Sequence, residues 1–372
     1  MKRLLVIANS FDAGGAETFL MKLFRRIDRS KYVFDFLVSV PDGKGGEGLY
    51  LDEIHSLGGR TFTVPMKLRH PVKCFRAVKR IVRENGYEYV LRLSQQSLAA
   101  LDLLAAKCGG ARVLAMRSTS AGLDGGTLFK LINFLFSPLP RMIPTVKLAP
   151  SENAAERTFG RGCVKNGKAH ILRNGLDFDD YAYSPDTARR IRDDLSLGER
   201  PVLGHIGRFS PEKNHRFLLE CFSELKKLTP DAALVLVGSG PLFEDTKAIA
   251  KQLGIYDDCR FLGQRTDVPE LFSAFDAVAL PSLYEGMPNV IIEAQAAGLR
   301  SLVSDTVTRE ANITGLVEYL PLEGGAGEWA GAVNEIFRQS SAFGRADTRD
   351  RFIAAGYGTE SVLNEFISLI FG

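Results

Sequence analysis

Two glutamates, Glu285 and Glu293, carry the strongest chemical signal in this sequence, where they bracket the string EGMPNVIIE. The stretch before them, DAVALP (276–281), has the apolar composition of a buried strand, so the segment predicts a strand, a loop and then a helix. Pro288 is expected at the first helical position and Gly298 at the helix end. The unpaired N–H groups of the first turn, together with the helix dipole, would bind an anion, typically a phosphate.

The positions of the two carboxylates around this anion site favour a sugar nucleotide as the ligand. Glu285 lies just before the site, and Glu293 lies about one and a half turns into the helix. One carboxylate can meet hydroxyl groups beside the phosphate, while the other reaches hydroxyl groups further along the same molecule. A capping residue and an exposed helical glutamate would explain the same pair. The specificity therefore comes from the whole string, with PSLY before it and AQAAG after it.

Two cations, Arg208 and Lys213, follow a second strand candidate, PVLGHIG (201–207). A diphosphate requires positive charge at a defined place, and charge-assisted hydrogen bonds contribute about 1.5–3 kcal/mol each. Seen alone, the pair would equally well be two solvated surface cations. Together with the Glu285 loop, it favours a site for a diphosphate.

Glycines also follow strand candidates, as Gly14 and Gly15 do in the first half and Gly238 and Gly240 in the second. Glycine allows the backbone to approach a ligand closely, although a plain tight turn explains each pair equally well. The third glycine of a dinucleotide fingerprint is absent, because Phe243 stands at that position. This argues against a nicotinamide site, and the lysine motif of a nucleoside-triphosphate loop is absent as well.

The composition indicates a globular protein of two domains, with 372 residues of which 45% are hydrophobic and 24% charged. No apolar run approaches the roughly 18 residues of a membrane-spanning helix, and RLLVIA is too short for a secretory signal. The scattered, odd set of cysteines predicts reduced thiols in the cytoplasm: Cys74, Cys108, Cys163, Cys221 and Cys259. No metal is predicted, because none of the histidines forms a ligand cluster: His55, His70, His170, His205 and His215.

Charge is distributed unevenly, since residues 1–180 hold 28 Lys and Arg against 17 Asp and Glu, and the remainder holds 19 against 27. A basic first half predicts an anionic partner or surface. Residues 67–83 are strongly basic and read as an amphipathic helix from Val72, either with a solvated face or lying on anionic lipid. Residues 127–144 are rich in Phe and Leu and are expected to be buried core in preference to a contact for a lipid-linked acceptor. No aromatic platform for nucleic acid is evident.

Short apolar strands alternate with helical patterns, such as 215–228, which predicts two doubly wound parallel-sheet α/β domains. We place them at 1–175 and 176–355, with residues 356–372 as a helix packing back on the first domain. Ligands bind beyond the carboxyl ends of such strands. The strand candidates are 3–8, 34–39, 61–64, 89–93, 112–116, 146–150, 201–207, 232–238, 259–263, 276–281 and 300–304.

With these residues assembled, the chain resembles the retaining glycosyltransferases of the GT-B fold that carry an E-x7-E signature, above all those that build bacterial exopolysaccharide and capsule. The resemblance spans nearly the whole chain and is most specific in its C-terminal block. It rests on GGAETFLMKLFRRIDRSKYVFDFL, LRNGLDFDDY, GHIGRFSPEKNH, LVLVGSGPL, FLGQRTDVPELF, LPSLYEGMPNVIIEAQAAGL, VSDTVTRE and ITGLVEYLPL.

The resemblance implies two Rossmann-like domains facing a central cleft, with the acceptor on the first and a nucleotide-diphosphate sugar, with uridine as the base, on the second. The acceptor would be a polysaccharide or a lipid-linked glycan, in a cytoplasmic enzyme attached to the inner face of the cell membrane. Glu285 would contact the donor sugar, Glu293 the ribose, and Arg208 and Lys213 would neutralise the diphosphate without a metal. Other donor contacts would come from Gly14, Gly15, Gly207, Gly238, Gly240, Arg265, Thr266, Gly286, Met287, Pro288 and Asn289.

The chain departs from its relatives at two strand ends of the first domain, LRLSQQ and LAMRSTS, where capsule-type members carry histidines. Arg117 and Ser118 stand at the second of these, and we assign them to the acceptor side. The missing histidines motivate one alternative, a sugar-nucleotide-binding protein without catalysis. A nucleotide-sugar epimerase of the same fold is a further alternative, although it requires acid and base groups around the sugar.

Overall fold

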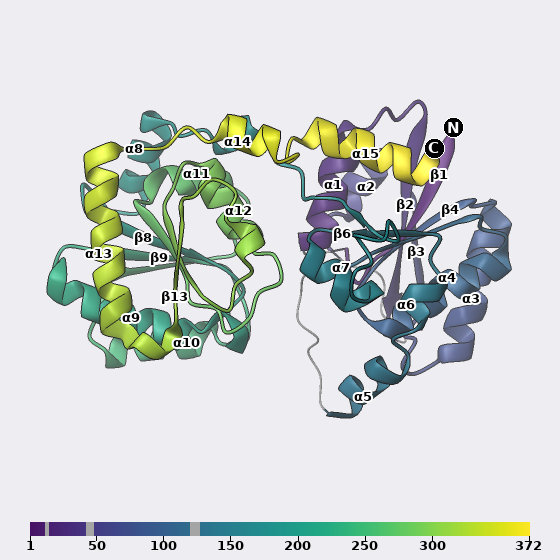
Figure 1. Cartoon of the computed structure of the whole chain (residues 1–372), viewed down its shortest axis with the longest axis horizontal. Helices are drawn as coiled ribbons and strands as arrows, with labels where there is room; N and C mark the ends of the chain where they lie inside the picture. Colours follow the sequence, from purple (N-terminus) through teal and green to yellow (C-terminus); the bar gives the residue numbers. More distant parts are fainter. Residues whose placement is uncertain (12–14, 42–47, 120–126) are drawn as a thin grey trace. The chain divides into compact units, whose positions relative to one another are not determined.

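The computed structural model describes residues 1–11, 15–41, 48–119 and 127–372, which form two compact units (Figure 1). The first unit comprises Met1–Gly175 and Thr359–Gly372, and the second comprises Leu176–Gly358. The chain thus returns to the first unit for its last helix. Across the described residues, no helix combines the length and the apolar character needed to cross a membrane.

The first unit is built on a seven-stranded parallel sheet in the order β3-β2-β1-β4-β5-β6-β7. Its strands are β1 (Lys2–Ile7), β2 (Tyr32–Val40), β3 (Thr61–Pro65), β4 (Tyr89–Leu93), β5 (Val113–Arg117), β6 (Val146–Ala149) and β7 (His170–Ile171). Its helices are α1 (Gly15–Arg26), α2 (Leu51–Ser56), α3 (Pro71–Asn85), α4 (Ala100–Gly109), α5 (Thr127–Leu135), α6 (Leu139–Met142), α7 (Glu152–Phe159) and α15 (Thr359–Phe371).

The second unit is built on a six-stranded parallel sheet in the order β10-β9-β8-β11-β12-β13. Its strands are β8 (Val202–Ile206), β9 (Ala233–Val237), β10 (Cys259–Gly263), β11 (Ala277–Leu280), β12 (Ser301–Ser304) and β13 (Val317–Leu320). Its helices are α8 (Pro185–Asp194), α9 (His215–Leu228), α10 (Phe243–Gln252), α11 (Val268–Ala274), α12 (Asn289–Ala296), α13 (Gly325–Phe343) and α14 (Arg349–Ala354).

Both sheets are buried on two faces, which explains the continuous apolar runs of their strands. In β1, Leu4 and Val6 pack into a core with α1 and α15, whereas Leu5 and Ile7 pack with α3, α4 and α7. Successive residues of a strand point to opposite faces, so one apolar run supplies both cores. The second unit repeats this arrangement with α11 and α12 on one face and α9, α10 and α13 on the other.

The predicted doubly wound α/β class is confirmed, and each of the predicted strands is present to within two residues at either end. The helix predicted at 215–228 has those bounds as α9. Two strands were missed. β7 has only two residues, and the edge strand β13 reads VEYL with a polar residue at its second position, so neither shows a long apolar run.

The two segments linked to a membrane behave differently from each other. The predicted amphipathic helix is present as α3, and its apolar residues Cys74, Val78 and Val82 are buried inside the first unit, whereas Val72 in its first turn is exposed along with its cations. The prediction of buried core for 127–144 is wrong for Leu131, Phe134, Leu135, Phe136 and Met142, whereas Pro140 and Pro144 are buried. Phe134 is 75% exposed and Met142 78% exposed. A high content of Phe and Leu did not ensure burial, because no element within the described residues covers these side chains.

Candidate functional site

Glu285 and Lys213 form the centre of the site at the carboxyl ends of β11 and β8. The loop after β8 ends in a 3₁₀ turn, Pro211–Lys213, from which the Lys213 ammonium group donates to Glu285 Oε1. Ser282 Oγ donates to the same oxygen at 3.1 Å. The two loops are also joined by their backbones, since the Leu283 N–H donates to Glu212 O at 2.8 Å. Both charged side chains are mostly buried, at 16% and 14% exposed, so the pair has a defined position.

Arg208 lies in the same loop as Lys213, but its environment is different. Its side chain is exposed, and no hydrogen-bond or ion-pair partner for its guanidinium is found among the residues that the structure describes. An unpaired guanidinium beside a buried ammonium–carboxylate pair can bind a phosphate bidentately without first breaking an internal contact. The two predicted cations therefore lie in the same loop at one strand edge. Lys213 is held in an ion pair, whereas the side chain of Arg208 is exposed.

Three of the predicted glycines let the loops after β8 and β9 pack against each other. A Cβ on Gly238, where φ is +136°, would lie 2.0 Å from Gly207 O, and one on Gly240 would lie 2.4 Å from Phe209 O. The Phe209 N–H donates to Ser239 O at 3.0 Å, which joins these loops. The close approach that these glycines allow is thus to a neighbouring backbone, and it sets the position of the loop that carries Arg208 and Lys213.

The helix after Glu285 begins one residue later than predicted, so the placement of Pro288 at the first helical position is wrong. Pro288 is the N-cap of α12, with ψ at 102°, and its carbonyl accepts from the N–H groups of Ile291 and Ile292. A φ of −76° suits either position, so the proline ring alone does not decide between them. Gly286, Met287 and Asn289 surround this helix start, where leading N–H groups have no helical acceptor.

Glu293 lies in the second turn of α12, half-buried, and has a partner that the sequence did not indicate. The hydroxyl of Tyr181 donates to Glu293, and burial together with this carboxylate raises the pKa of Tyr181 above its ordinary range. Tyr181 is 4% exposed and belongs to the 3₁₀ turn Phe178–Tyr181. The hydrogen bond fixes the direction of the Glu293 carboxylate. The block LRNGLDFDDY ends in Tyr181, but no sequence pattern links Tyr181 to Glu293, because the two are separated by more than a hundred residues.

The remaining predicted residues lie at the same kind of edge or in the first unit. Arg265 and Thr266 follow β10 and are exposed, and Arg265 forms an ion pair with Asp267 at 2.5 Å. Gly15 is the first residue of α1, and Gly14 lies outside the described residues. Arg265 and Thr266 therefore lie at the carboxyl edge of the second sheet, and Gly15 lies after the carboxyl end of β1 in the first unit.

Arg117 and Ser118, predicted for the acceptor side, are each 1% exposed and have interior partners. Arg117 donates to Asn174 Oδ1 at 2.6 Å and lies over the ring of Phe19 at 3.9 Å. Burial lowers its pKa to about 9. Ser118 Oγ lies 2.6 Å from Thr158 Oγ1. These contacts hold the end of β5 on its neighbours, and the acceptor role of both residues stays a prediction.

Two buried histidines, His205 and His215, lie next to the loop of Lys213, and their ring centroids are 4.8 Å apart. His215 stacks on Phe209 at 4.2 Å, and neither of its ring nitrogens has a partner among the described residues. Burial first, and then the charge of Lys213, lowers the pKa of His215 to about 4. Burial and the neighbouring His215 lower the pKa of His205 as well. Both rings are therefore neutral at pH 7.

We expect the protein to lose stability as the pH falls from 6.5 to 4, and His215→Phe to reduce that loss. The folded pKa of His215 lies below its ordinary value of 6.5, so its contribution is fully present above pH 6.5 and disappears as the ring takes up a proton. The expected loss between pH 7 and pH 4.5 from this ring is about 2–3 kcal/mol. Phenylalanine keeps the stacking and cannot be protonated. Denaturant unfolding at both pH values measures the effect.

The exposed His170, replaced in the same way, is the matched control and should leave the pH dependence as it is. An unchanged free-energy difference between the two pH values in His215→Phe would show that protonation of this ring does not unfold the loop.

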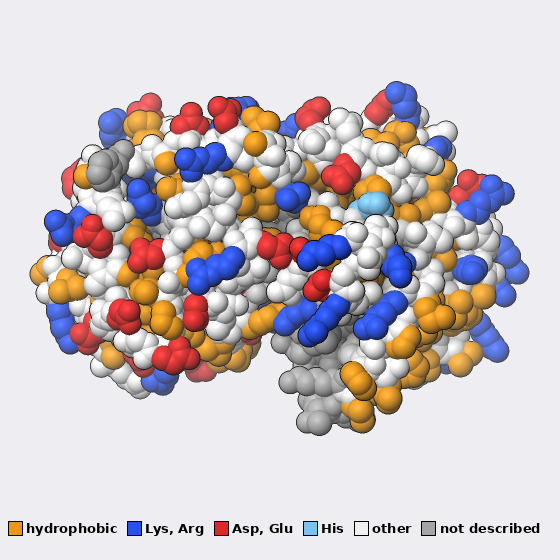
Figure 2. Space-filling model, viewed as in Figure 1, with side chains coloured by type: hydrophobic (Ala, Val, Ile, Leu, Met, Phe, Trp, Pro, Cys, Tyr) orange, Lys and Arg blue, Asp and Glu red, His pale blue; other side chains and the backbone are white. Residues whose placement is uncertain are grey.

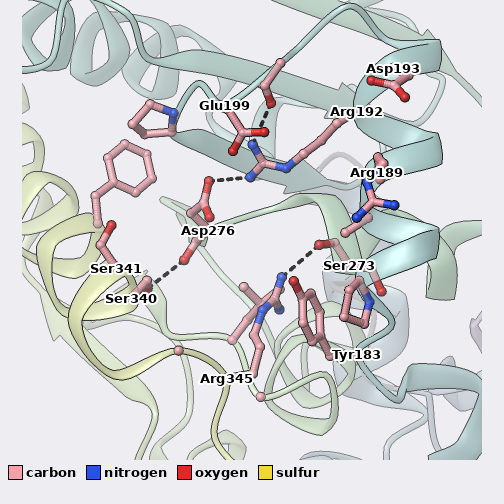
Figure 3. A pocket seen from close by; sticks show the side chains of 18 residues that line it. Tyr183, Arg189, Arg192, Asp193, Glu199, Ser273, Asp276, Ser340, Ser341 and Arg345 are labelled. Atoms are coloured by element: carbon pink, nitrogen blue, oxygen red, sulfur yellow. Dashed lines mark hydrogen bonds and ion pairs between the residues drawn. The ribbon is translucent and has the colours of Figure 1, made fainter.

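A cavity of about 500 Å³ lies at the opposite, amino edge of the second sheet, next to Pro201, Asp276 and Leu299 (Figure 3). Two arginines that line it, Arg192 and Arg345, donate hydrogen bonds to groups of the protein itself. Arg192 donates to Asp276 at 2.8 Å, and Arg345 donates to the carbonyls of Phe272, Ser273 and Phe275 at the end of α11. The arginines therefore hold α8, α11 and the segment after α13 together, and they do not form a second anion site.

Comparisons with known proteins show which family the second unit resembles. A family model described as glycosyl transferases group 1 matches residues 187–358. EpsF of Bacillus subtilis, which is named as a glycosyltransferase without a stated donor or acceptor, is 34% identical over 92% of this chain and 89% of its own length. An Escherichia coli UDP-Gal:alpha-D-GlcNAc-diphosphoundecaprenol alpha-1,3-galactosyltransferase is 33% identical over 37% of each chain.

Among solved structures, HepE of Anabaena in complex with UDP and glucose has a TM-score of 0.78 and 19% sequence identity, covering 99% of each chain. At this identity the likeness concerns the fold, and it identifies the two-sheet architecture as GT-B.

Proposed function

Because this chain belongs to the group 1 glycosyl transferases, we propose that it moves a sugar from a UDP-sugar to a lipid-linked acceptor during the synthesis of a cell-surface polysaccharide. The observation that carries the proposal is the Lys213–Glu285 pair before the start of α12, with the exposed Arg208 in the same loop as Lys213. The named E. coli relative uses a UDP-sugar and a diphosphoundecaprenol acceptor, which supports this choice of donor and acceptor class.

In the proposed reaction the bond between the anomeric carbon and the diphosphate breaks, and a new bond to an acceptor hydroxyl forms on the same face. Arg208, Lys213 and the start of α12 stabilise the negative charge that develops on the departing diphosphate. Glu285 binds hydroxyl groups of the transferred sugar, and Glu293, held by Tyr181, binds those of the ribose. The proton of the acceptor hydroxyl passes to the departing phosphate. Retention of configuration is part of this proposal.

We also propose that this charge stabilisation needs no metal. Two cations at the diphosphate supply positive charge that a divalent ion supplies in other enzymes. In the described part of the chain, no three His, Cys, Asp or Glu side chains are grouped closely enough to hold a metal ion. Full turnover after treatment with a chelator is the expected result.

Incubation of the protein with UDP- and GDP-sugars, with and without an undecaprenyl-diphosphate-linked sugar acceptor, tests the proposal. Transfer, or slow hydrolysis of one donor, is the expected outcome, and the anomeric configuration of the product checks retention. Isomerisation of the sugar would indicate an epimerase instead. Binding without turnover, detected as a rise in melting temperature with the nucleoside diphosphate, would indicate a binding protein.

We further propose that the reaction takes place at the cytoplasmic face of the membrane, with the first unit facing the lipid. That unit holds 28 Lys and Arg against 16 Asp and Glu, whereas the second holds 19 against 28. A basic surface is attracted to anionic lipid. All five cysteines are unpaired, as is usual in a reducing compartment.

A further inference from the structure

The first unit exposes large apolar side chains from two segments that are far apart in the sequence. Leu68 and Val72, at the start of α3, are 73% and 59% exposed. The second segment, 131–142, exposes five large apolar side chains to between 42% and 78%, and Figure 2 shows hydrophobic side chains gathered at this end of the unit. We name these residues the apolar patch: Leu68, Val72, Leu131, Phe134, Leu135, Phe136 and Met142.

Both segments are anchored to the same 3₁₀ turn, Ser97–Ala99, which places them next to each other. Asn133 Oδ1 accepts from the Ser97 N–H at 2.9 Å, and Asn133 O accepts from Ser97 Oγ at 2.8 Å. Lys67 Nζ donates to Leu98 O at 3.2 Å and forms an ion pair with Asp102. Asn133 is 6% exposed, so its inward side is fixed, and the apolar side chains around it are held on the outside.

Exposed cations adjoin both segments of the patch in the chain. The exposed side of α3 carries Lys73 and Arg76. Arg141 is exposed between Phe136 and Met142, and it packs on the loop after α7, where a Cβ on Gly160 would lie 3.3 Å from Arg141 Nε. Residues 131–168 together hold six basic and two acidic side chains.

We propose that the apolar patch inserts into the interfacial layer of an anionic lipid bilayer, while the surrounding Lys and Arg side chains bind lipid phosphates. The choice of a bilayer rests on the proposed lipid-linked acceptor and on charge complementarity, since amphipathic surfaces rimmed by cations bind anionic interfaces. α3 itself does not insert as an amphipathic helix, because its apolar side is used in the core of the unit. Its first turn and its cations take part instead.

The test is flotation of the full-length protein with vesicles of phosphatidylglycerol and phosphatidylethanolamine, and with vesicles of phosphatidylcholine alone. The wild type is expected to bind the anionic vesicles. The double variant Phe134→Ser/Leu135→Ser is expected to bind about tenfold more weakly or worse, because it removes two of the most exposed apolar groups. The matched control is Leu228→Ser/Ile353→Ser, which changes two side chains of the second unit that are each 54% exposed and should leave binding unchanged.

A charge-reversal variant, Arg76→Glu/Arg141→Glu, is expected to weaken binding to anionic vesicles roughly tenfold at low salt and to reduce its salt dependence. Equal flotation of the wild type and the Phe134→Ser/Leu135→Ser variant would overturn the proposal. So would a wild-type dimer that becomes a monomer in this variant and binds no vesicle, since the patch would then be a contact between two copies of the chain.

Hydrolysis of a soluble donor without lipid separates this proposal from the proposed function. The patch variants should hydrolyse the donor at the wild-type rate, because the patch lies in the first unit and the donor loops lie in the second. A protein that binds vesicles through the patch but turns over no donor would disprove the proposed activity and support the proposed membrane-binding patch. Full donor hydrolysis without vesicle binding would support the activity and disprove the membrane-binding patch.

Discussion

Glu285→Gln is expected to lower turnover by about a hundredfold or more while the protein stays folded. The substitution keeps the size of the side chain and a hydrogen bond from Ser282, but it removes the negative charge that positions the Lys213 ammonium group. It also replaces a strong acceptor for the hydroxyls of the donor sugar with a weaker one. Losing one preorganised group at a charged transition state typically lowers turnover by this amount.

Steady-state turnover with the best donor of the panel measures the effect, and circular dichroism and thermal melting verify the fold. We expect a loss of unfolding free energy of about 1–3 kcal/mol, because the change leaves a mostly buried ammonium group without its charged partner. Glu335→Gln is the matched control, since Glu335 is exposed on α13 and forms an ion pair with Arg338 within its own helix. A Glu285→Gln enzyme with near-normal turnover would remove Glu285 from the site.

Arg208→Ala is expected to lower turnover between about tenfold and a thousandfold without changing the melting temperature. The guanidinium is exposed and has no internal partner within the described ranges, so its removal breaks no contact of the folded protein. Its contribution is made only when the diphosphate is bound and is largest as negative charge develops on the departing oxygens. The loss should therefore fall on kcat more than on KM.

Three further variants make this experiment specific. Arg208→Lys should recover part of the rate, because lysine supplies charge but not a bidentate pair of donors. Lys213→Ala should lower turnover by a similar factor and also lower stability, since it leaves the Glu285 carboxylate without its charged partner. Arg216→Ala, which removes an exposed arginine of α9 whose pair is Glu220, is the control and should change neither quantity. Normal rates in both Arg208→Ala and Lys213→Ala would refute the proposed stabilisation of the leaving group.

Much of the fold was predictable because its determinants are local. A parallel strand that is covered on both faces must be apolar along its whole length, and β9 and β11 are buried throughout. α9 shows the 3.6-residue period of a helix with one buried side, and its bounds were found without the structure. The same reasoning failed for residues 131–142, because an apolar composition favours burial only where another element is present to cover it.

The site was predictable to the level of which loops form it. Glu285, Arg208 and Lys213 follow strands in the sequence, and parallel strands end at a common edge, so their grouping follows from the topology. The contacts that these side chains form could not be predicted from the topology. The ion pair of Lys213 with Glu285 spans 72 residues, and the contact of Tyr181 with Glu293 spans more than a hundred.

By itself, the sequence determined the two parallel-sheet domains, the strand edges at which the candidate site residues lie and the kinds of charge present there, because periodicity and turn chemistry act over a few residues. Only the tertiary structure decided that Lys213 is paired and that Arg208 has no partner within the described parts of the chain. It also decided that only a glycine fits at position 238, because a Cβ there would lie 2.0 Å from Gly207 O, and that apolar residues of α5 and of the segment after it are exposed. These outcomes depend on contacts between distant segments, and packing in three dimensions selects such contacts from many that the local pattern allows.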